Sequence, residues 1–109
     1  TITRDGHIAN KIGTFQIALL ADRFGIPYYV TGIPDADKKN AADISIEQRN
    51  PEETLSCHGV RHTLPAVKGL YPAFDITPPE LIKGIVTDKG IYRPQELGTY
   101  FDTPQDRFY

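Results

Sequence analysis

The residues best suited to chemistry lie at the predicted start of a helix over residues 8–24. Gly6 turns the chain just before it, because glycine accepts a positive φ. The first-turn N–H groups of a helix have no partners within it and carry the positive end of its dipole. Asn10 can add a hydrogen bond and Lys11 a positive charge, both suited to a phosphate. The sequence therefore predicts an anion site here, unless Asn10 and Lys11 are ordinary solvated helix residues.

Asp75 is a second candidate. It lies near the end of a predicted strand over residues 73–76, just before the sequence Thr77-Pro78-Pro79-Glu80. A carboxylate at such a strand end can hold substrate hydroxyls. It can equally help to cap the helix predicted behind Thr77, and the sequence leaves both interpretations open.

Cysteine and histidine side chains do not form a convincing site. Cys57 and His58 are neighbours, and adjacent side chains of an extended segment point to opposite faces, so they make a poor nucleophile–base pair. His58 and His62 could share a metal on a helix, but Gly59 and Pro65 disfavour that helix and no further ligand is near. The sequence predicts no metal site.

The elements around these residues indicate an α/β protein. The helix over residues 8–24 has an apolar face at helical spacing; that face comprises Ile8, Ile12, Phe15, Ala18 and Leu19. Gly25 suits a left-handed C-terminal cap, and Ile26-Pro27 prevents continuation. An apolar strand over residues 28–31 follows, predicted to be covered on both faces. Helix, turn and strand form half of a βαβ unit, which favours a Rossmann-like parallel sheet with flanking helices.

The remaining sequence predicts shorter elements. Residues 32–50 read as a long loop with an extended stretch over 44–46. Asn50-Pro51 has the signature of a helix start, with asparagine as the N-cap and proline at the first helical position. Thr77 and Glu80 resemble a capping box, which predicts a helix reaching residue 85 or 86. A turn follows at 88–90, then a short helix from Pro94 and a frayed tail.

Composition excludes several classes of protein. The chain has 109 residues, a net charge of −2, one cysteine and no methionine. Acids and bases are mixed, which argues against nucleic-acid binding. No apolar stretch approaches the roughly 20 residues of a membrane span. A single cysteine cannot form an internal disulfide, which favours a cytoplasmic location. The missing methionine leads us to expect a fragment of a longer protein.

Several sequence runs resemble one family in order along the chain. The run from Gly6 to Thr14 is similar to the "G-x-x-x-N-K-I-G-T" motif of methylthioribose-1-phosphate isomerases. That motif also occurs in ribose-1,5-bisphosphate isomerases and in regulatory subunits of the initiation factor 2B exchange complex. The other similar runs cover residues 25–30, 46–53, 59–61, 72–78 and 80–90. The "E-x-R-x-P-E-E" and "G-V-R" runs favour the methylthioribose branch.

The resemblance implies that residues 1–109 are a fragment of the C-terminal Rossmann-like domain of a two-domain, homodimeric isomerase. It implies aldose–ketose isomerisation of 5-methylthioribose 1-phosphate, a step of methionine salvage, without a cofactor. The family's catalytic Asp, in a "G-A-D" motif, would fall just before Thr1 and its catalytic Cys further upstream, so no catalytic residue is expected in this chain. Asn10 and Lys11 match substrate-contacting positions. The expected partners are a phosphorylated pentose and either a second copy or the missing N-terminal half.

Departures from the family pattern widen the range of substrates that we expect. After Val30 the isomerases usually read "A-x-P-x-S-T-x-D", whereas this chain reads T-G-I-P-D-A-D. A related 5-substituted ribose 1-phosphate is therefore also expected to be a substrate. Two alternatives stay open. One is a non-catalytic regulatory subunit that binds a sugar phosphate or nucleotide, and the other is a separately encoded chain that completes a site on a partner.

Overall fold

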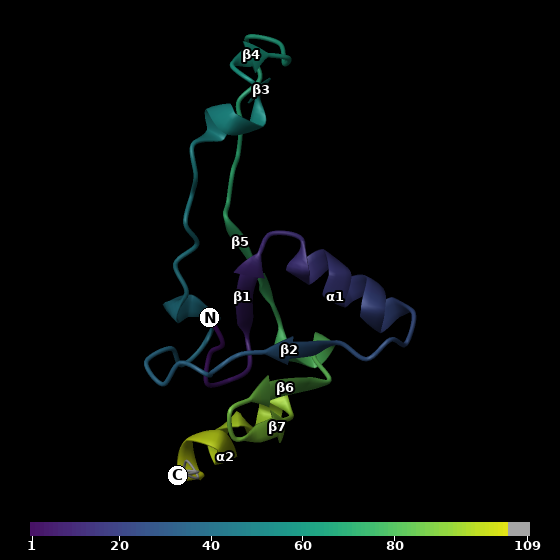
Figure 1. The fold of residues 1–109 in the computed structure, drawn as a ribbon, viewed down its shortest axis with the longest axis vertical. Coiled ribbons are helices and arrows are strands. Elements are labelled where there is room, and N and C mark those ends of the chain that lie inside the picture. Colours follow the sequence, from purple (N-terminus) through teal and green to yellow (C-terminus); the bar gives the residue numbers. More distant parts are fainter. Residues whose placement is uncertain (105–109) are drawn as a thin grey trace.

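The computed structural model describes residues 1–104 as three small sheets, two α-helices and four 3-10 turns (Figure 1). The helices are α1 (Thr14–Arg23) and α2 (Leu97–Asp102). The strands are β1 (Ile8–Lys11), β2 (Tyr29–Thr31), β3 (Ser56–Cys57), β4 (Val60–Arg61), β5 (Phe74–Thr77), β6 (Gly84–Thr87) and β7 (Gly90–Tyr92). The 3-10 turns are η1 (Ala41–Asp43), η2 (Pro51–Thr54), η3 (Pro79–Leu81) and η4 (Pro94–Glu96).

The predicted helix over residues 8–24 is wrong in its first part. Residues 8–11 form β1, which pairs antiparallel with β5 so that Ile8 faces Thr77 and Lys11 faces Phe74. Gly13, with φ of 105°, ends the strand segment and precedes the first residue of α1. Pairing with a strand more than 60 residues away satisfies the backbone of residues 8–11, and local periodicity cannot reveal such a pairing.

Helix α1 buries its small residues and exposes its large ones. Thr14, Ala18 and Ala21 are buried, whereas Phe15 is 36% and Leu19 44% exposed. Within α1 the predicted apolar face is therefore correct only at Ala18, while Ile8 is buried as predicted but on β1. The predicted end of the helix is confirmed: Gly25 has a φ of 66° and donates to Asp22 O at 3.1 Å, while Ile26 N donates to Ala21 O at 2.8 Å. These two bonds define a Schellman motif.

Strand β2 is parallel to β6, and β7 then pairs with β6 antiparallel, so the sheet is mixed. The predicted parallel pairing is thus confirmed for one pair only. The predicted burial of β2 on both faces is wrong, because Tyr29 is 50% exposed and Thr31 is exposed as well. In the described residues β2 is an edge strand, with β6 on one side.

The predicted helix behind Thr77 is also wrong. Only η3 forms, its N-cap position is Pro78, and no side chain makes a capping hydrogen bond there. Residues 84–87 instead form β6, in which Ile85 is completely buried. Burial of Ile85 next to β2 stabilises the strand, and this tertiary contact overrides the local helix signal.

A long arm leaves the body between β2 and β5, as Figure 1 shows. Residues 32–50 form the predicted loop with only η1 inside it, and the expected extended stretch over 44–46 forms no strand. Asn50 does cap a short 3-10 turn, accepting from Glu52 N at 3.1 Å. At the tip, β3 and β4 form a hairpin whose central residues His58 and Gly59 have φ of 50° and 77°. Positive φ at both positions is typical of a type I′ turn.

The core joins the first residues of the chain to the last elements. Ile2, Ile8, Ile82, Ile85, Leu97 and Tyr100 form one buried cluster. The Tyr100 hydroxyl donates to Asp88 Oδ1 at 2.9 Å, and burial together with the Asp88 carboxylate raises the pKa of Tyr100. The N-terminal turn and the C-terminal helix α2 therefore stabilise each other.

Two buried threonines provide a matched pair of stability predictions. Thr3 and Thr77 are both completely buried. The Thr3 hydroxyl donates to Asp5 Oδ1 at 2.6 Å and accepts from His7 N at 2.9 Å, whereas Thr77 Oγ1 has no hydrogen-bond partner within residues 1–104. We expect Thr3→Val to lower the free energy of unfolding by about 1–3 kcal/mol and Thr77→Val to raise it by about 1 kcal/mol. Urea denaturation of the two variants tests this difference, and a destabilising Thr77→Val would show that the hydroxyl has a polar partner.

Candidate functional site

The candidate site is a groove at the carboxyl end of β2, here called the β2-end groove. It has a volume of about 190 Å³. Its lining comprises Thr1, Ile2, Ile8, Ala9, Asn10, Val30, Thr31, Gly32 and Ile33. Ligands of open α/β sheets bind outside the carboxyl ends of parallel strands, and β2 is a parallel strand of this structure. The position and the polar lining at Asn10 and Thr31 make this groove the best candidate.

Thr1 and Asn10 come together because residues 1–2 fold back along β1. Thr1 exchanges two backbone hydrogen bonds with Ala9, from the terminal amine to Ala9 O at 3.0 Å and from Ala9 N to Thr1 O at 2.9 Å. Ile2 and Ile8 form an antiparallel bridge. The same register would place a residue preceding Thr1 opposite Asn10.

The turn at residues 3–7 that makes this reversal is held by side chains. Asp5 accepts from the Thr3 hydroxyl at 2.6 Å and lies 2.9 Å from His7 Nδ1. Burial acts to raise the pKa of Asp5, but the hydrogen bonds from Thr3 and His7 and the positive charge of His7 outweigh it, so the pKa is lowered. His7 is thus a structural residue of this turn.

Asn10 and Lys11 both lie on β1 and are both exposed. Successive strand residues alternate faces, so the two side chains leave β1 on opposite sides. Asn10 lines the β2-end groove, and Lys11 makes no ion pair in residues 1–104. The prediction that Asn10 and Lys11 lie at the start of a helix is wrong, because both belong to strand β1. Whether they contact a substrate stays a prediction.

The true start of α1 is already occupied. Asp75 on β5 accepts from Gly13 N at 2.7 Å and from Phe15 N at 3.1 Å. Of the two interpretations left open for Asp75, the structure supports capping, although of α1 rather than of the turn behind Thr77. Sequence reasoning missed this contact because Asp75 and Gly13 are 62 residues apart.

The remaining candidates contribute no site. Cys57 ends β3 and is exposed, and His58 occupies the hairpin turn beside it. Among residues 1–104, no group of three or more His, Cys, Asp or Glu side chains could hold a metal ion.

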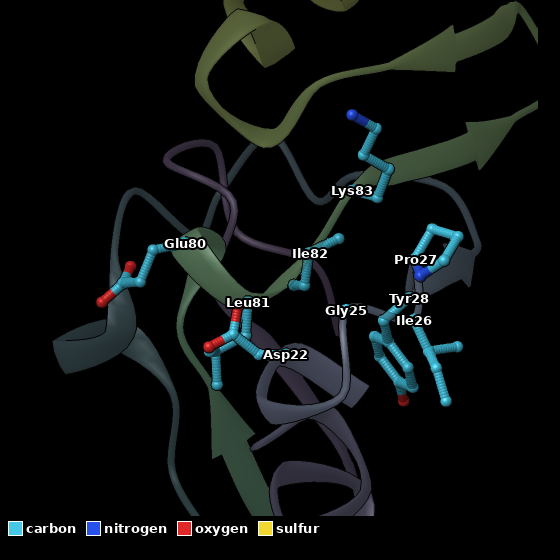
Figure 2. Close-up of a pocket in the computed structure, with 9 residues that line it drawn as sticks. All are labelled: Asp22, Gly25, Ile26, Pro27, Tyr28, Glu80, Leu81, Ile82 and Lys83. Atoms are coloured by element: carbon cyan, nitrogen blue, oxygen red, sulfur yellow. The ribbon is translucent and has the colours of Figure 1, made fainter. Parts of the chain in front are cut away.

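A larger cavity lies elsewhere. About 460 Å³ in volume, it is formed by the end of α1, the residues before β2 and the segment from Glu80 to Lys83 (Figure 2). Figure 2 shows the charged ends of Glu80 and Lys83 directed apart, so they do not converge on one ligand. The cavity lies at the amino ends of β2 and β6, the end of a parallel sheet where ligands do not usually bind. The smaller β2-end groove therefore stays the better candidate.

These features define an α/β protein with small sheets, one of which is mixed. A model of the Initiation factor 2 subunit family matches residues 1–94, and the chain belongs to that family.

Among its relatives are methylthioribose-1-phosphate isomerases. The enzyme of Geobacillus thermodenitrificans is 50% identical over 93 residues, covering 83% of this chain and 26% of the relative. That of Aquifex aeolicus is 43% identical over 99 residues, covering 88% of this chain and 22% of the relative. The chain thus spans about a quarter of the length of the curated relatives that it matches.

Two solved structures resemble the fold closely. The 5-methylthioribose 1-phosphate isomerase of Pyrococcus horikoshii superposes with a TM-score of 0.81 at 40% identity, covering 93% of this chain and 29% of the other. The delta subunit of translation initiation factor eIF-2B from A. fulgidus gives a TM-score of 0.79 at 30% identity, covering 94% and 31%. No helix within residues 1–104 has the length and apolar character that crossing a membrane requires.

Proposed function

We propose that this chain is part of an aldose–ketose isomerase that converts 5-methylthioribose 1-phosphate, or a related 5-substituted ribose 1-phosphate, to the ribulose 1-phosphate. The single observation that carries the proposal is the position of Asn10. It lines the β2-end groove next to Thr1, in a chain that is 43–50% identical to isomerases named for this substrate.

The reaction needs an acid and a phosphate-binding group. A phosphate on C1 blocks spontaneous ring opening, so the ring oxygen must first be protonated, and hydrogen then moves from C2 to C1. In our proposal the acid is the Asp of the family's "G-A-D" motif, preceding Thr1. The antiparallel register of Thr1 with Ala9 would bring that Asp opposite Asn10.

The chain's own contribution is to bind and orient the sugar phosphate. The Asn10 amide can donate to a phosphate or hydroxyl oxygen, and the exposed Lys11 ammonium can supply a positive charge. Proximity and orientation can lower an activation barrier by roughly 7–11 kcal/mol. Holding the substrate next to the acid in this way can supply several kcal/mol of that amount. No cofactor is required, and we propose a homodimer as the working form.

Turnover by the complete protein tests this proposal. We expect it to convert 5-methylthioribose 1-phosphate to the ketose, followed by the appearance of the carbonyl signal in ¹³C NMR. We expect residues 1–109 alone to give no turnover, because the proposed acid precedes Thr1. Absence of turnover by the complete protein across a panel of 5-substituted ribose 1-phosphates would refute the isomerase assignment.

A second candidate function is a non-catalytic regulatory subunit that binds a sugar phosphate or nucleotide. The likeness to the A. fulgidus eIF-2B delta subunit favours it. The residues encoded before Thr1 discriminate the two. An intact "G-A-D" and an upstream cysteine favour the enzyme, and a replaced Asp favours the regulator.

A further inference from the structure

The start of α1 is the part of the molecule where an anion would bind most readily, and it already holds one. The Asp75 carboxylate accepts from the amides of Gly13 and Phe15 with one oxygen each, at 2.7 and 3.1 Å. These are two of the four N–H groups that a helix leaves without partners at its start. Asp75 is half-buried and comes from β5, so it is fixed by the sheet rather than by the helix that it caps.

Two contacts with β5 and its neighbour Ala73, and one contact within the turn, fix the turn that follows Lys11. Asp75 holds Gly13, and Ile12 N donates to Ala73 O at 3.2 Å. The Thr14 hydroxyl donates to Lys11 O at 2.6 Å. In the β1–β5 ladder, Asn10 lies opposite Asp75 itself. Asp75 therefore holds the turn directly after Lys11 and also lies opposite Asn10 in the ladder.

We propose that Asp75 is a positioning residue of the substrate site, an inference that rests on the proposed function. Its carboxylate occupies the anion-binding end of α1. It excludes the substrate's phosphate from that end because it repels the phosphate's negative charge and because it already accepts the hydrogen bonds of the Gly13 and Phe15 amides. The phosphate is thereby left to Lys11, while Asn10, on the other face of β1, can hold a hydroxyl of the same sugar. The same contact holds the turn over residues 11–14, and with it the direction in which Lys11 leaves β1.

The alternative is that Asp75 only stabilises the fold, as any capping carboxylate does. Asp43 provides a matched control, because its carboxylate also accepts two backbone amides, from Lys39 at 2.7 Å and Asn40 at 3.2 Å. Asp43 caps η1, and its carboxylate bonds go to Lys39 and Asn40 rather than to the turn over residues 11–14. A purely structural role predicts that loss of either carboxylate has the same kind of effect.

The kinetic test compares Asp75→Ala, Asp75→Asn and Asp43→Ala in the complete protein. We expect Asp75→Ala to lower kcat/KM by about 10- to 100-fold, since small displacements of a binding group have effects of this size. We expect Asp75→Asn to recover part of the loss, because its amide oxygen can still accept one N–H. Asp43→Ala should leave kcat/KM within about twofold. Equal losses in Asp75→Ala and Asp43→Ala would overturn the proposal.

An NMR measurement tests the same inference without turnover. The sequence contains one Thr-Phe pair, Thr14-Phe15, so ¹³C-carbonyl threonine with ¹⁵N-phenylalanine selects the Phe15 amide within this chain. We expect inorganic phosphate to leave this signal unmoved in the wild-type protein and to shift it in Asp75→Ala, where the amide is freed. A phosphate-induced shift in the wild type would overturn the proposal. If the complete protein turns over no sugar, the proposed function fails, and this measurement still decides whether Asp75 excludes anions from α1.

Discussion

Replacing Lys11 by alanine is expected to raise the KM of the complete protein for its phosphorylated substrate by about 10- to 100-fold. A charged hydrogen bond contributes about 1.5–3 kcal/mol, and each 1.4 kcal/mol changes an equilibrium constant tenfold. Lys11 is exposed and has no acidic partner in residues 1–104, so no carboxylate of this part of the chain competes with the phosphate for it. Steady-state kinetics with 5-methylthioribose 1-phosphate and the other 5-substituted ribose 1-phosphates of the panel measures the change in KM.

Lys83→Ala is the control for loss of a surface charge. Lys83 is also exposed, but it lines the large cavity at the amino end of β6. Its replacement should leave KM unchanged if the phosphate binds beside β1. An unchanged KM in Lys11→Ala would eliminate the phosphate role of Lys11, and a raised KM in Lys83→Ala would point to the other cavity.

The sequence predicts those features whose physical cause is local. The Schellman end of α1 follows from Gly25 alone, since only a residue that tolerates positive φ closes the helix in that way. The Asn50-Pro51 cap and the strand near residues 73–76 are also confirmed. For the helix end and the cap, the residues that determine the structure lie within a few positions of it, whereas the strand also needs its distant partner β1.

The errors arise where distant residues compete with a local signal. Ile8 and Ile12 have helical spacing with Phe15, yet the backbone of residues 8–11 pairs with β5. Thr77 and Glu80 match a capping box, yet Thr77 ends a strand and is buried against β1. The ladder between β1 and β5 decides the first outcome, and this ladder together with the pairing of β6 with β2 decides the second.

The candidate site was predicted in part, and for a partly wrong reason. Asn10 and Lys11 were selected as the start of a helix, but they belong to a strand that carries Asn10 into the β2-end groove. The general expectation that ligands gather at strand carboxyl ends leads to Thr31 in the same groove. The capping of α1 by Asp75 depends on a contact across 62 residues, and the only capping that the sequence offered was of the helix behind Thr77.

Replacing Gly6 by alanine is expected to destabilise the fold strongly. Among the described glycines that have a positive φ and do not line the β2-end groove, we expect Gly6 to show the largest loss. Gly6 has a φ of 90°, and an added Cβ would lie 2.6 Å from Pro94 Cβ and 3.1 Å from Pro79 Cβ. Proline side chains are rigid rings, so neither neighbour can rotate away. The left-handed backbone costs about 1–2 kcal/mol and the overpacking about 1–3 kcal/mol, which together give about 2–5 kcal/mol.

Gly25→Ala separates these two contributions. Gly25 also has a positive φ, of 66°, but an added Cβ would meet no atom within 4 Å. Its replacement should therefore lower the free energy of unfolding only by the backbone cost of about 1–2 kcal/mol. Urea denaturation followed by circular dichroism compares the two variants. Equal losses would show that the contact with Pro94 contributes nothing. A larger loss in Gly6→Ala means that close packing against η4 fixes the turn over residues 3–7, which brings Thr1 beside Asn10.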